Sequence, residues 1–377
     1  MSEKGMTAIS LKKINRSKVY RYIYKSKQTS KMQIVSDLQM GLSTVSQNLT
    51  ALESDGLIER SGNFDSTGGR KAQAIKIVSD FRISVGVGIL KDMFHLVAVD
   101  LYGSVLCGKT VNLTYSGSKE YYDLVCDNIK SFIAENNYTE NSILGVSIAT
   151  QGITSLDNSS VIYGNIMGNT GMSINDFSSR LPYPCRLEHD SKAAAFLEMW
   201  NRPELDSMIV LLLNQNLGGA VITNRQIHNG STMHSGTFEH ICINPTGPLC
   251  YCGNHGCLET YCSASALKQN ANMELREFFS ALKNNPTPKI KEIWNNYLEH
   301  LAFAIRNLNL IIDSPVIISG YIAVFLTDED IEILLGFINK YSVFPMDKSK
   351  ILLGTHGQYT QAVGAALYYT DGFINEV

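Results

Sequence analysis

One stretch of the chain reads His240-Ile-Cys-Ile-Asn-Pro-Thr-Gly-Pro-Leu-Cys250-Tyr-Cys252-Gly-Asn-His-Gly-Cys257-Leu-Glu259. Three of the eight cysteines fall within eight residues, and His240 precedes the first of them by ten. One imidazole and three thiolates make the four ligands of a closed tetrahedral Zn²⁺ site. The alternative is a set of buried free thiols, which are common in protein cores. Proline and glycine around the cysteines favour a loop, so this stretch, residues 240–257, predicts a zinc knuckle with one structural Zn²⁺ per chain.

The rest of the chain is long enough for more than one domain. Its 377 residues predict two or three domains. No apolar run reaches the length of a membrane span, and Met1-Ser-Glu-Lys-Gly lacks the basic-then-apolar layout of a secretory signal. We therefore expect a cytoplasmic protein without membrane contact, in which reduced cysteines remain available to bind metal.

The charge is distributed unevenly along the chain. Residues 1–80 hold 13 lysines and arginines against 7 aspartates and glutamates, a balance of +6, whereas the remainder has a balance of -9. A small basic segment joined to a large acidic one indicates that the first eighty residues meet a polyanion. Solvated helices are often basic too, so charge alone does not identify that polyanion.

The basic segment has the pattern of a helix-turn-helix. Apolar residues recur at helical spacing over 16–27, 31–38 and 43–56, and Gly56 is suited to end the third helix. The third helix carries Ser43, Thr44, Gln47 and Asn48, which we expect to face outward. Glutamine and asparagine can read adenine edges, and serine and threonine can hold phosphates. Polar residues on a solvated helix face are the alternative for each one alone.

A hairpin follows the third helix and strengthens the DNA-binding interpretation. Strand-like segments at 57–60 and 74–78 flank a loop that contains Gly69, Arg70 and Lys71. Two glycines beside adjacent cations predict a slim basic tip that can enter a narrow minor groove. Residues 1–80 are therefore predicted to form a winged helix-turn-helix domain that binds double-stranded DNA.

Three motifs together resemble one known family. Thr44-Val-Ser-Gln-Asn-Leu, Ser66-Thr-Gly-Gly-Arg-Lys-Ala and the cysteine stretch are similar to the repressor branch of the ROK family (repressors, open reading frames and kinases). The resemblance implies an α/β protein in which a winged helix precedes a two-lobed body of the actin/hexokinase type, related to ribonuclease H. It also implies sugar-responsive control of transcription by a homodimer or homotetramer.

The order of expected elements suits such a body. Strands are predicted at 83–89, 94–100, 104–113 and 143–149 and a helix at 119–136, followed by strands at 208–213 and 218–223. Further helices are predicted at 264–283, 289–312 and about 358–369, with a strand at 316–319. We assign residues 81–188 and about 358–377 to the first lobe and 189–357 to the second.

The phosphate-handling features of a ROK kinase are altered in this chain. Gly88 and Leu90 stand where the family has an acid and a glycine, and the turn Asn214-Gln-Asn216-Leu-Gly218 has two asparagines in place of glycines. The adenosine turn reads Ser319-Gly320-Tyr321. Side chains at these positions would obstruct the approach of backbone to phosphate. Three independent departures argue against ATP chemistry and predict that the protein is not an enzyme.

The sugar-binding positions are closer to the ROK family pattern than the phosphate-handling positions are. The resemblance assigns the ligand contacts to Asn169, His189, Asp190, Thr237, His240 and Glu259. Asp190 follows a strand and begins a helix, where α/β folds place ligand groups, and it is the vestigial position of the kinase base. Two residues depart from the family pattern, because His189 replaces an asparagine and Thr237 replaces a glutamate, with an acid displaced to Glu239. The alternatives are a capping carboxylate at Asp190, a helix-start charge at Glu259 and a packed histidine at His189.

These observations lead to one function and two alternatives. We expect a zinc-containing regulator, a repressor of carbohydrate genes, whose affinity for operator DNA changes when a sugar or sugar derivative binds between the lobes. One alternative is an ATP-dependent sugar kinase with a DNA-binding head. The other is a ligand-blind regulator controlled by a protein partner, which the changes at His189 and Thr237 leave open.

Overall fold

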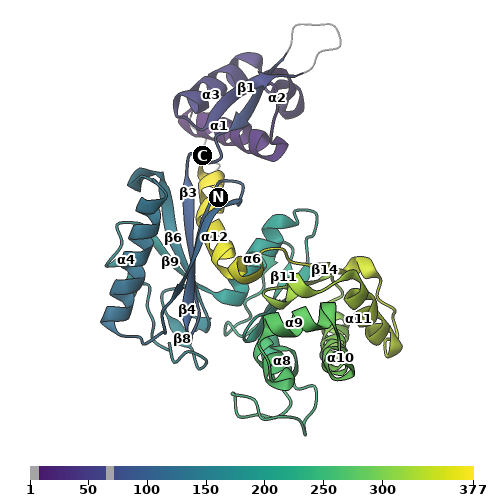
Figure 1. The fold of residues 1–377 in the computed structure, drawn as a ribbon. Coiled ribbons are helices and arrows are strands. Elements are labelled where there is room, and N and C mark those ends of the chain that lie inside the picture. The colour runs from purple at the N-terminus through teal and green to yellow at the C-terminus, as the bar shows by residue number, and fades with distance from the viewer. Residues whose placement is uncertain (1–7, 65–71) are drawn as a thin grey trace.

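The computed structural model of the chain describes residues 8–64 and 72–377. A small head lies above a body of two lobes, and each lobe is built around its own five-stranded sheet (Figure 1). Short 3-10 helices punctuate the connections: η1 (Glu140–Ser142), η2 (Phe238–His240), η3 (Ile322–Phe325), η4 (Lys348–Lys350) and η5 (Gly357–Tyr359).

The head contains the three helices and the hairpin that the sequence predicts. Ser30 begins the second helix because its side chain accepts a hydrogen bond from the backbone N–H of Gln33. The turn after the third helix depends on Gly56, which has a φ of 73°. The elements are α1 (Ala8–Ser26), α2 (Lys31–Leu38), α3 (Leu42–Ser54), β1 (Ile58–Asn63) and β2 (Gln73–Ile77).

The first lobe has a mixed sheet in the order β5-β4-β3-β6-β9. The first three strands form an antiparallel meander, and β6 and β9 continue the sheet in parallel with β3. Helix α4 (Lys119–Glu135) packs on one face and α12 (Thr360–Glu376) on the other (Figure 1). The strands are β3 (Ile83–Ile89), β4 (Met93–Val99), β5 (Val105–Asn112), β6 (Ile143–Thr150) and β9 (Cys185–His189), with β7 (Ile153–Thr154), β8 (Val161–Tyr163) and α5 (Asn175–Ser178) between β6 and β9.

The second lobe has a sheet in the order β12-β11-β10-β13-β14, with helices packed against it around a large apolar core. Its strands are β10 (Met208–Leu213), β11 (Leu217–Thr223), β12 (Gln226–Ile227), β13 (Val316–Ser319) and β14 (Ile351–Leu353). Its helices are α7 (Glu259–Cys262), α8 (Ala264–Ala271), α9 (Leu275–Asn284), α10 (Pro288–Ile311) and α11 (Asp328–Lys340).

Several elements of the body differ from the sequence prediction. The helix expected over 264–283 is divided into α8 and α9, because Asn272 adopts a left-handed conformation, with a φ of 49°, that ends the first of them. Helix α11 and the short strand β14 were not predicted. The last helix starts two residues later than expected and continues to Glu376 rather than ending near residue 369.

Helix α6 (Asp190–Asn201) connects the first lobe to the second. It begins directly after β9 of the first lobe, packs against α12 and also contacts β10 and β11 of the second lobe. The two helices approach closely at Gly364, where a Cβ atom would lie 1.8 Å from the carbonyl oxygen of Ala193. Glycine is therefore required at this crossing, and α6 is held tightly between the lobes.

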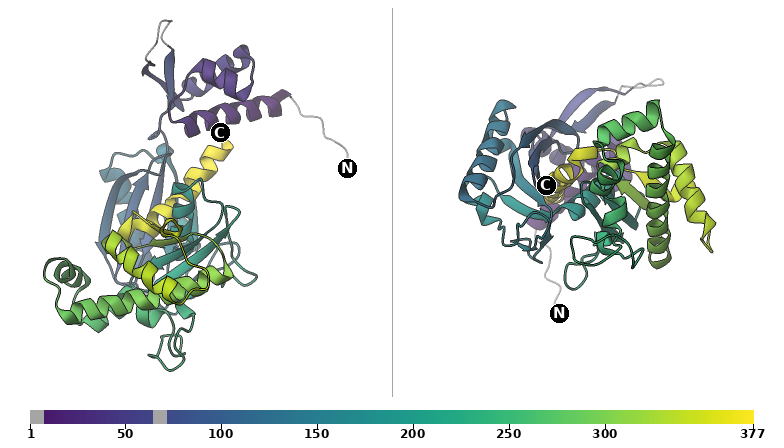
Figure 2. Two further views of the ribbon diagram at one scale, coloured as in Figure 1. Left: turned by 90° about the vertical axis from the view of Figure 1, so that its right-hand side faces the viewer. Right: turned by 60° about the horizontal axis from the view of Figure 1, so that its bottom comes forward.

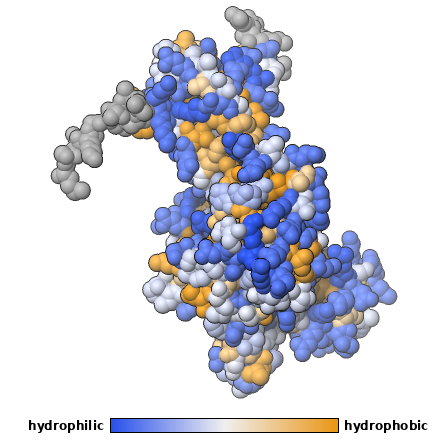
Figure 3. All heavy atoms as spheres, turned by 90° about the vertical axis from the view of Figure 1, so that its left-hand side faces the viewer, coloured by the Kyte–Doolittle hydropathy of each residue, from blue (hydrophilic) through white to orange (hydrophobic). Residues whose placement is uncertain are grey.

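The head is packed on the body rather than tethered to it. Tyr24 of α1 stacks on Tyr102, with ring centroids 5.0 Å apart, and the ammonium of Lys27 lies 3.8 Å from the centre of the same ring. Trp200, at the end of α6, donates a hydrogen bond of 3.1 Å to the carbonyl of Tyr102. The apolar core of the head also includes Ile374 of α12. Both views in Figure 2 place the C-terminal end of α12 beside the head, and Figure 3 shows hydrophobic residues continuing from the head into the upper body.

In the part of the chain that the structure describes, no helix combines the length and apolar character needed to cross a membrane.

Candidate functional site

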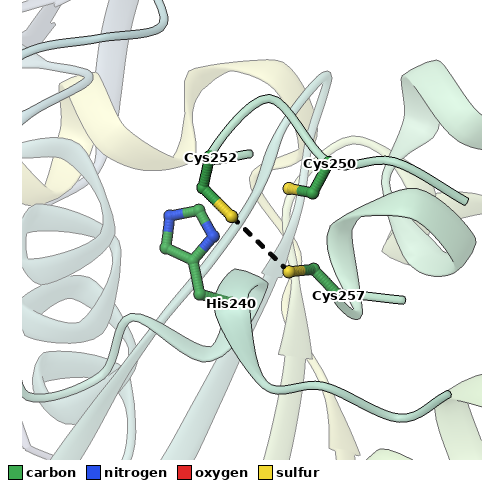
Figure 4. A group of neighbouring side chains, drawn as sticks. All are labelled: His240, Cys250, Cys252 and Cys257. Atoms are coloured by element: carbon green, nitrogen blue, oxygen red, sulfur yellow. Dashed lines mark hydrogen bonds between the residues drawn. The ribbon is translucent and has the colours of Figure 1, made fainter. Parts of the chain in front are cut away.

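The structure brings the four predicted metal ligands together. The ligand atoms of His240, Cys250, Cys252 and Cys257 all lie within 4.8 Å of one another. The sulfurs of Cys252 and Cys257 are 3.7 Å apart (Figure 4). A tetrahedron with zinc–sulfur bonds of about 2.3 Å has sulfurs separated by about 3.8 Å. The four side chains therefore have a spacing that fits a tetrahedral metal ion.

The histidine of this cluster has two differently placed ring nitrogens. Nδ1 of His240 is buried and has no hydrogen-bond partner among the described residues. The other nitrogen, Nε2, lies 3.5 Å from the hydroxyl of Tyr251. Figure 4 shows the ring beside the sulfurs, with one nitrogen turned toward them. A buried nitrogen without a partner beside three thiols is consistent with a metal ligand.

The thiols are packed too closely to ionise together without a cation. Burial, together with hydrogen bonds that its thiol donates to Cys252 and Cys250, raises the pKa of Cys257 to about 12. Thiolates bind metal and thiols do not, so a divalent cation would offset the cost of ionising this cluster.

A cavity of about 570 Å³ lies next to the cluster, at the junction of the two lobes. The metal cluster and the cavity share two residues, His240 and Cys252. The wall of the cavity combines amide, imidazole, carboxylate and aromatic side chains. This combination suits a small ligand with many hydroxyl groups. The polar and aromatic residues that line it include Gln151, Tyr163, Asn165, His189, Asp190, Asn216, His234, Thr237, Glu239, His240, Tyr251 and Asn254.

Asp190 stands at the first residue of α6 and is mostly buried. Its Oδ1 accepts hydrogen bonds from the backbone N–H and the hydroxyl of Ser191, at 2.7 and 3.1 Å. Among the described residues, Oδ2 has no hydrogen-bond donor. Burial raises the pKa of Asp190 to about 6, although the bonds from Ser191 lower it. One carboxylate oxygen thus remains free to accept a proton donor of a ligand.

His189 precedes this carboxylate and is uncharged. Its Nε2 lies 3.5 Å from Oδ1 of Asp190, and its Nδ1 is buried without a partner in the described part of the chain. Burial and the nearby charge of Lys192 lower the pKa of His189 to about 3. The imidazole therefore offers the cavity a neutral group rather than a charge.

Helix α6 and strand β11 meet in close contact under the cavity. A Cβ atom on Gly218 would lie 2.2 Å from the hydroxyl oxygen of Ser191. A side chain at position 218 would displace the hydroxyl of Ser191, so Gly218 lets β11 of the second lobe lie close to the residue that holds Asp190.

Thr237 lines the cavity, but its hydroxyl donates a 2.9 Å hydrogen bond to the carbonyl of His234. Glu239, two residues later, also lines the cavity, and its Oε2 is buried without a partner in the described ranges. Burial, followed by the nearby charges of Asp190 and Glu259, raises the pKa of Glu239 to about 8. Glu239 is not among the ligand contacts that the resemblance assigns. Its position two residues after Thr237, where the family has a glutamate, is the sequence feature that could have indicated it.

Two predicted ligand contacts lie behind the cavity wall. The amide of Asn169 is buried and donates to the hydroxyl of Thr150, at 3.0 Å, and to the carbonyl of Gln151, at 2.8 Å. The carboxylate of Glu259 accepts hydrogen bonds from the side chain of Asn216, at 2.8 Å, and from the backbone N–H of Leu217, at 2.7 Å. Neither Asn169 nor Glu259 is part of the cavity lining. Asn169 instead holds Gln151, and Glu259 holds Asn216 and Leu217. All three of these residues line the cavity.

The predicted DNA contacts are partly exposed. Ser43 and Gln47 are exposed on α3 and Thr44 is half-buried. Asn48 does not face outward as expected, because it is buried and its amide donates a 2.8 Å hydrogen bond to the carbonyl of Thr44. Gly69, Arg70 and Lys71 lie outside the described residues.

Three of the altered phosphate positions lie at a second cavity, of about 560 Å³, whereas Asn216 lines the first. Leu90, Asn214 and Tyr321 all line the second cavity. Oδ1 of Asn214 accepts a 2.7 Å hydrogen bond from the backbone N–H of Tyr321, and its Nδ2 lies 3.4 Å from Oε1 of Gln361. The side chain of Asn214 therefore occupies space that a glycine would leave open.

The described chain therefore combines a head of three helices and a hairpin with two α/β lobes, a cavity at the lobe junction and a His-Cys₃ cluster beside that cavity. The chain belongs to the ROK family, whose model matches residues 83–371.

Two groups of named relatives are similar in sequence. The xylose repressor of Bacillus subtilis (strain 168) is 25% identical over 259 residues, which cover 68% of this chain and 67% of the relative. The DNA-binding transcriptional dual regulator NagC of Escherichia coli (strain K12) is 25% identical over 276 residues, which cover 72% of this chain and 68% of NagC.

Solved structures share the fold. A ROK family transcriptional regulator described as a homolog of E. coli Mlc covers 97% of both chains at 15% identity, with a TM-score of 0.75. A ROK family glucokinase from Streptomyces griseus, in complex with glucose and AMPPNP, covers 76% of this chain and 98% of its own at 22% identity, with a TM-score of 0.65. The match to the regulator thus covers nearly the whole of this chain, and the match to the kinase covers about three quarters of it.

Proposed function

We propose that the protein is a transcriptional repressor of carbohydrate genes whose DNA affinity is set by a sugar or sugar derivative in the 570 Å³ cavity. The observation that carries this proposal is the course of α6. The helix begins at Asp190 in the cavity wall and ends beside Trp200, which contacts the residue on which the head stacks. The names of the similar repressors support the same function.

The cavity supplies groups that suit sugar hydroxyls. The free oxygen of Asp190 accepts a hydroxyl proton, and the amides of Gln151 and Asn216 offer both donors and acceptors. These three residues come from both lobes, so a ligand that contacts them all favours one relative position of the lobes. That preference shifts the population of two states only if the ligand binds them with different affinity.

The zinc site supports the wall of the cavity. His240, Cys250, Cys252 and Cys257 would hold one Zn²⁺ per chain, and four protein ligands leave no open position for catalysis. Bound zinc would supply structural stabilisation of the loop. Because His240 and Tyr251 both line the cavity, the order of that loop determines the shape of the ligand site.

The head would bind operator DNA through α3 and the hairpin loop. Ser43, Thr44 and Gln47 are the α3 side chains available for contacts, and Gly69, Arg70 and Lys71 are assigned to the minor groove from sequence alone. A winged helix of this size reads a short half-site, so two copies in a homodimer, or pairs within a homotetramer, would read a palindromic operator.

A sugar kinase is the second candidate, because Asp190 is retained and kinases share the fold. Leu90, Asn214 and Tyr321 at the second cavity oppose it, since side chains replace the glycines that let backbone approach phosphate. We therefore propose that the protein is not an enzyme.

Fluorescence anisotropy with DNA from the promoter region upstream of its gene tests the proposal. We expect salt-sensitive binding that changes when xylose, N-acetylglucosamine or another sugar of a panel is added. Asp190→Asn should bind the same DNA but lose the sugar response. Absence of DNA binding would refute the repressor, and sugar-dependent release of ADP in a coupled assay would favour the kinase. If calorimetry detects no binding of any sugar in the panel, the result would favour a regulator that is controlled by a protein partner.

A further inference from the structure

A third cavity, of about 380 Å³, lies on the other side of β9 and α6 from the ligand cavity. Neighbouring residues of β9 face the two cavities in turn, since Glu188 lines this one and His189 lines the other. In the same way Asp190 of α6 lines the ligand cavity, whereas Lys192 lines this one. The proposed sugar site makes no use of this space.

Lys192 is a buried charge with few partners. Only 5% of the residue is exposed, and its ammonium has one hydrogen bond among the described residues, of 3.5 Å, to the carbonyl of Met233. An ammonium group has three donors. Burial lowers the pKa of Lys192, which agrees with an incompletely satisfied charge. A bound acceptor would offset that cost.

The charged residues around the cavity favour an anion. Arg186, Lys192 and Arg225 are cationic, Glu188 is the one acid, and the other lining residues are uncharged. Arg225 is already engaged, because its guanidinium donates to four backbone carbonyls. Arg186 donates from Nε to Glu188 and lies 4.5 Å from the ring centre of Tyr368. Its two terminal nitrogens have no acceptor in the described part of the chain.

We propose that this cavity binds a small oxyanion of the phosphate class. The terminal nitrogens of Arg186 and the ammonium of Lys192 are the donors, because a guanidinium and an ammonium together suit a tetrahedral oxyanion. Glu188 weakens the attraction without cancelling it, since three cations face one acid. The site spans the junction, with Arg186 on the first lobe and Asn229 after β12 of the second, so an anion there also joins the lobes.

Isothermal titration calorimetry of the full chain tests the proposal, with inorganic phosphate, sulfate and acetate at an ionic strength held constant with sodium chloride. We expect one phosphate per chain. Lys192→Met keeps the length of the side chain without its charge, so it should lower the affinity for phosphate at least about tenfold. Glu188→Gln removes the repulsion between the carboxylate and the anion, so it should raise the affinity for phosphate at least about threefold.

The matched control is Lys268→Met, an exposed lysine of the second cavity that pairs with Glu274, and it should leave phosphate affinity unchanged. Circular dichroism checks that Lys192→Met is folded, and if it is not, Glu188→Gln alone decides. No phosphate binding to the natural chain, or equal affinity in the natural chain and Glu188→Gln, overturns the proposal. Acetate bound with the same dependence on Glu188 supports the site and assigns its ligand to carboxylates. This test needs no DNA or sugar, so it is independent of the repressor assay.

Discussion

The side-chain amide of Gln151 donates a 3.3 Å hydrogen bond to Oδ1 of Asn216 and thereby connects the two lobes across the ligand cavity. Asn216 also donates to Glu259, at 2.8 Å. Asn216 stands where the ROK kinase pattern has a glycine, and so does Asn214, whose amide reaches Gln361 on α12. Both asparagines therefore connect elements of different lobes at a turn that, in a kinase of this fold, would face phosphate.

Replacement of this connecting residue tests its part in ligand response. Asn216→Gly removes its hydrogen bonds to Gln151 and Glu259, each worth about 1 kcal/mol. We expect sugar affinity, measured by calorimetry, to fall about five- to thirtyfold while DNA affinity without sugar changes little. The control is Gln215→Ala, because the neighbouring Gln215 makes no side-chain hydrogen bond in the described ranges. Equal losses in both variants would contradict the prediction.

The raised pKa of Asp190 predicts how ligand binding depends on pH. The carboxylate accepts hydroxyl protons only when ionised, so sugar affinity should fall as the pH drops through about 6. A separate change is expected near pH 8, where Glu239 of the same cavity titrates. Calorimetry between pH 5 and pH 8 measures this profile. An affinity that does not fall between pH 7 and pH 5 would show that burial does not raise the pKa of this group as described.

The same carboxyl group predicts an opposite effect on stability. The folded state holds its proton more tightly than the unfolded state, so this group stabilises the fold as the pH falls from 6 toward 3.8. At pH 8 the buried charge is a cost, and Asp190→Asn should raise the melting temperature by roughly 2–4 °C. The difference should shrink at pH 5, as followed by circular dichroism. Asp190→Glu keeps the charge and serves as the control, with no gain expected.

The metal cluster predicts different outcomes for two cysteines of one stretch. Cys252→Ser removes a ligand, so elemental analysis should find much less than the natural value of about one zinc per chain, with a lower melting temperature. Cys242→Ser is the control, because Cys242 is exposed and lies outside the four-residue cluster. One zinc per chain in Cys252→Ser would exclude this residue as a ligand.

The contact between the head and α6 predicts a separation of DNA binding from sugar response. Trp200→Leu removes the hydrogen bond to Tyr102 and the edge contact with Tyr24, whose ring centroid lies 6.4 Å away. We expect operator affinity without sugar within about threefold of natural and a sugar response reduced by at least half, both from anisotropy. Tyr341→Leu, an exposed aromatic of the second lobe, is the control. An intact response in Trp200→Leu would show that α6 does not transmit the ligand signal.

The sequence was most informative where function depends on residues close together in the chain. The four metal ligands lie within eighteen residues, and their spacing alone predicted the cluster. Asn169 and Glu259 show the limit, because a motif indicates that a residue is near a site but not which way its side chain turns. Asn48 is a further example, because its side chain is buried and its amide donates a hydrogen bond to the carbonyl of Thr44, one helical turn earlier. The cavity containing Lys192 depends on contacts between α6, β12 and α12, and no local pattern encodes them.

Helix α12 extends from the second cavity, at Gln361, to the core of the head, at Ile374. An excised fragment of residues 1–80 would therefore leave an apolar face uncovered. Deletion of the last few residues would damage the head rather than the lobe in which α12 begins. Protein prepared for biochemistry should keep Ile374 and Phe373 and carry any affinity tag away from that end. Substitutions selected for loss of repression are expected to map to this helix end, although it is more than three hundred residues away in sequence from the residues that would touch DNA.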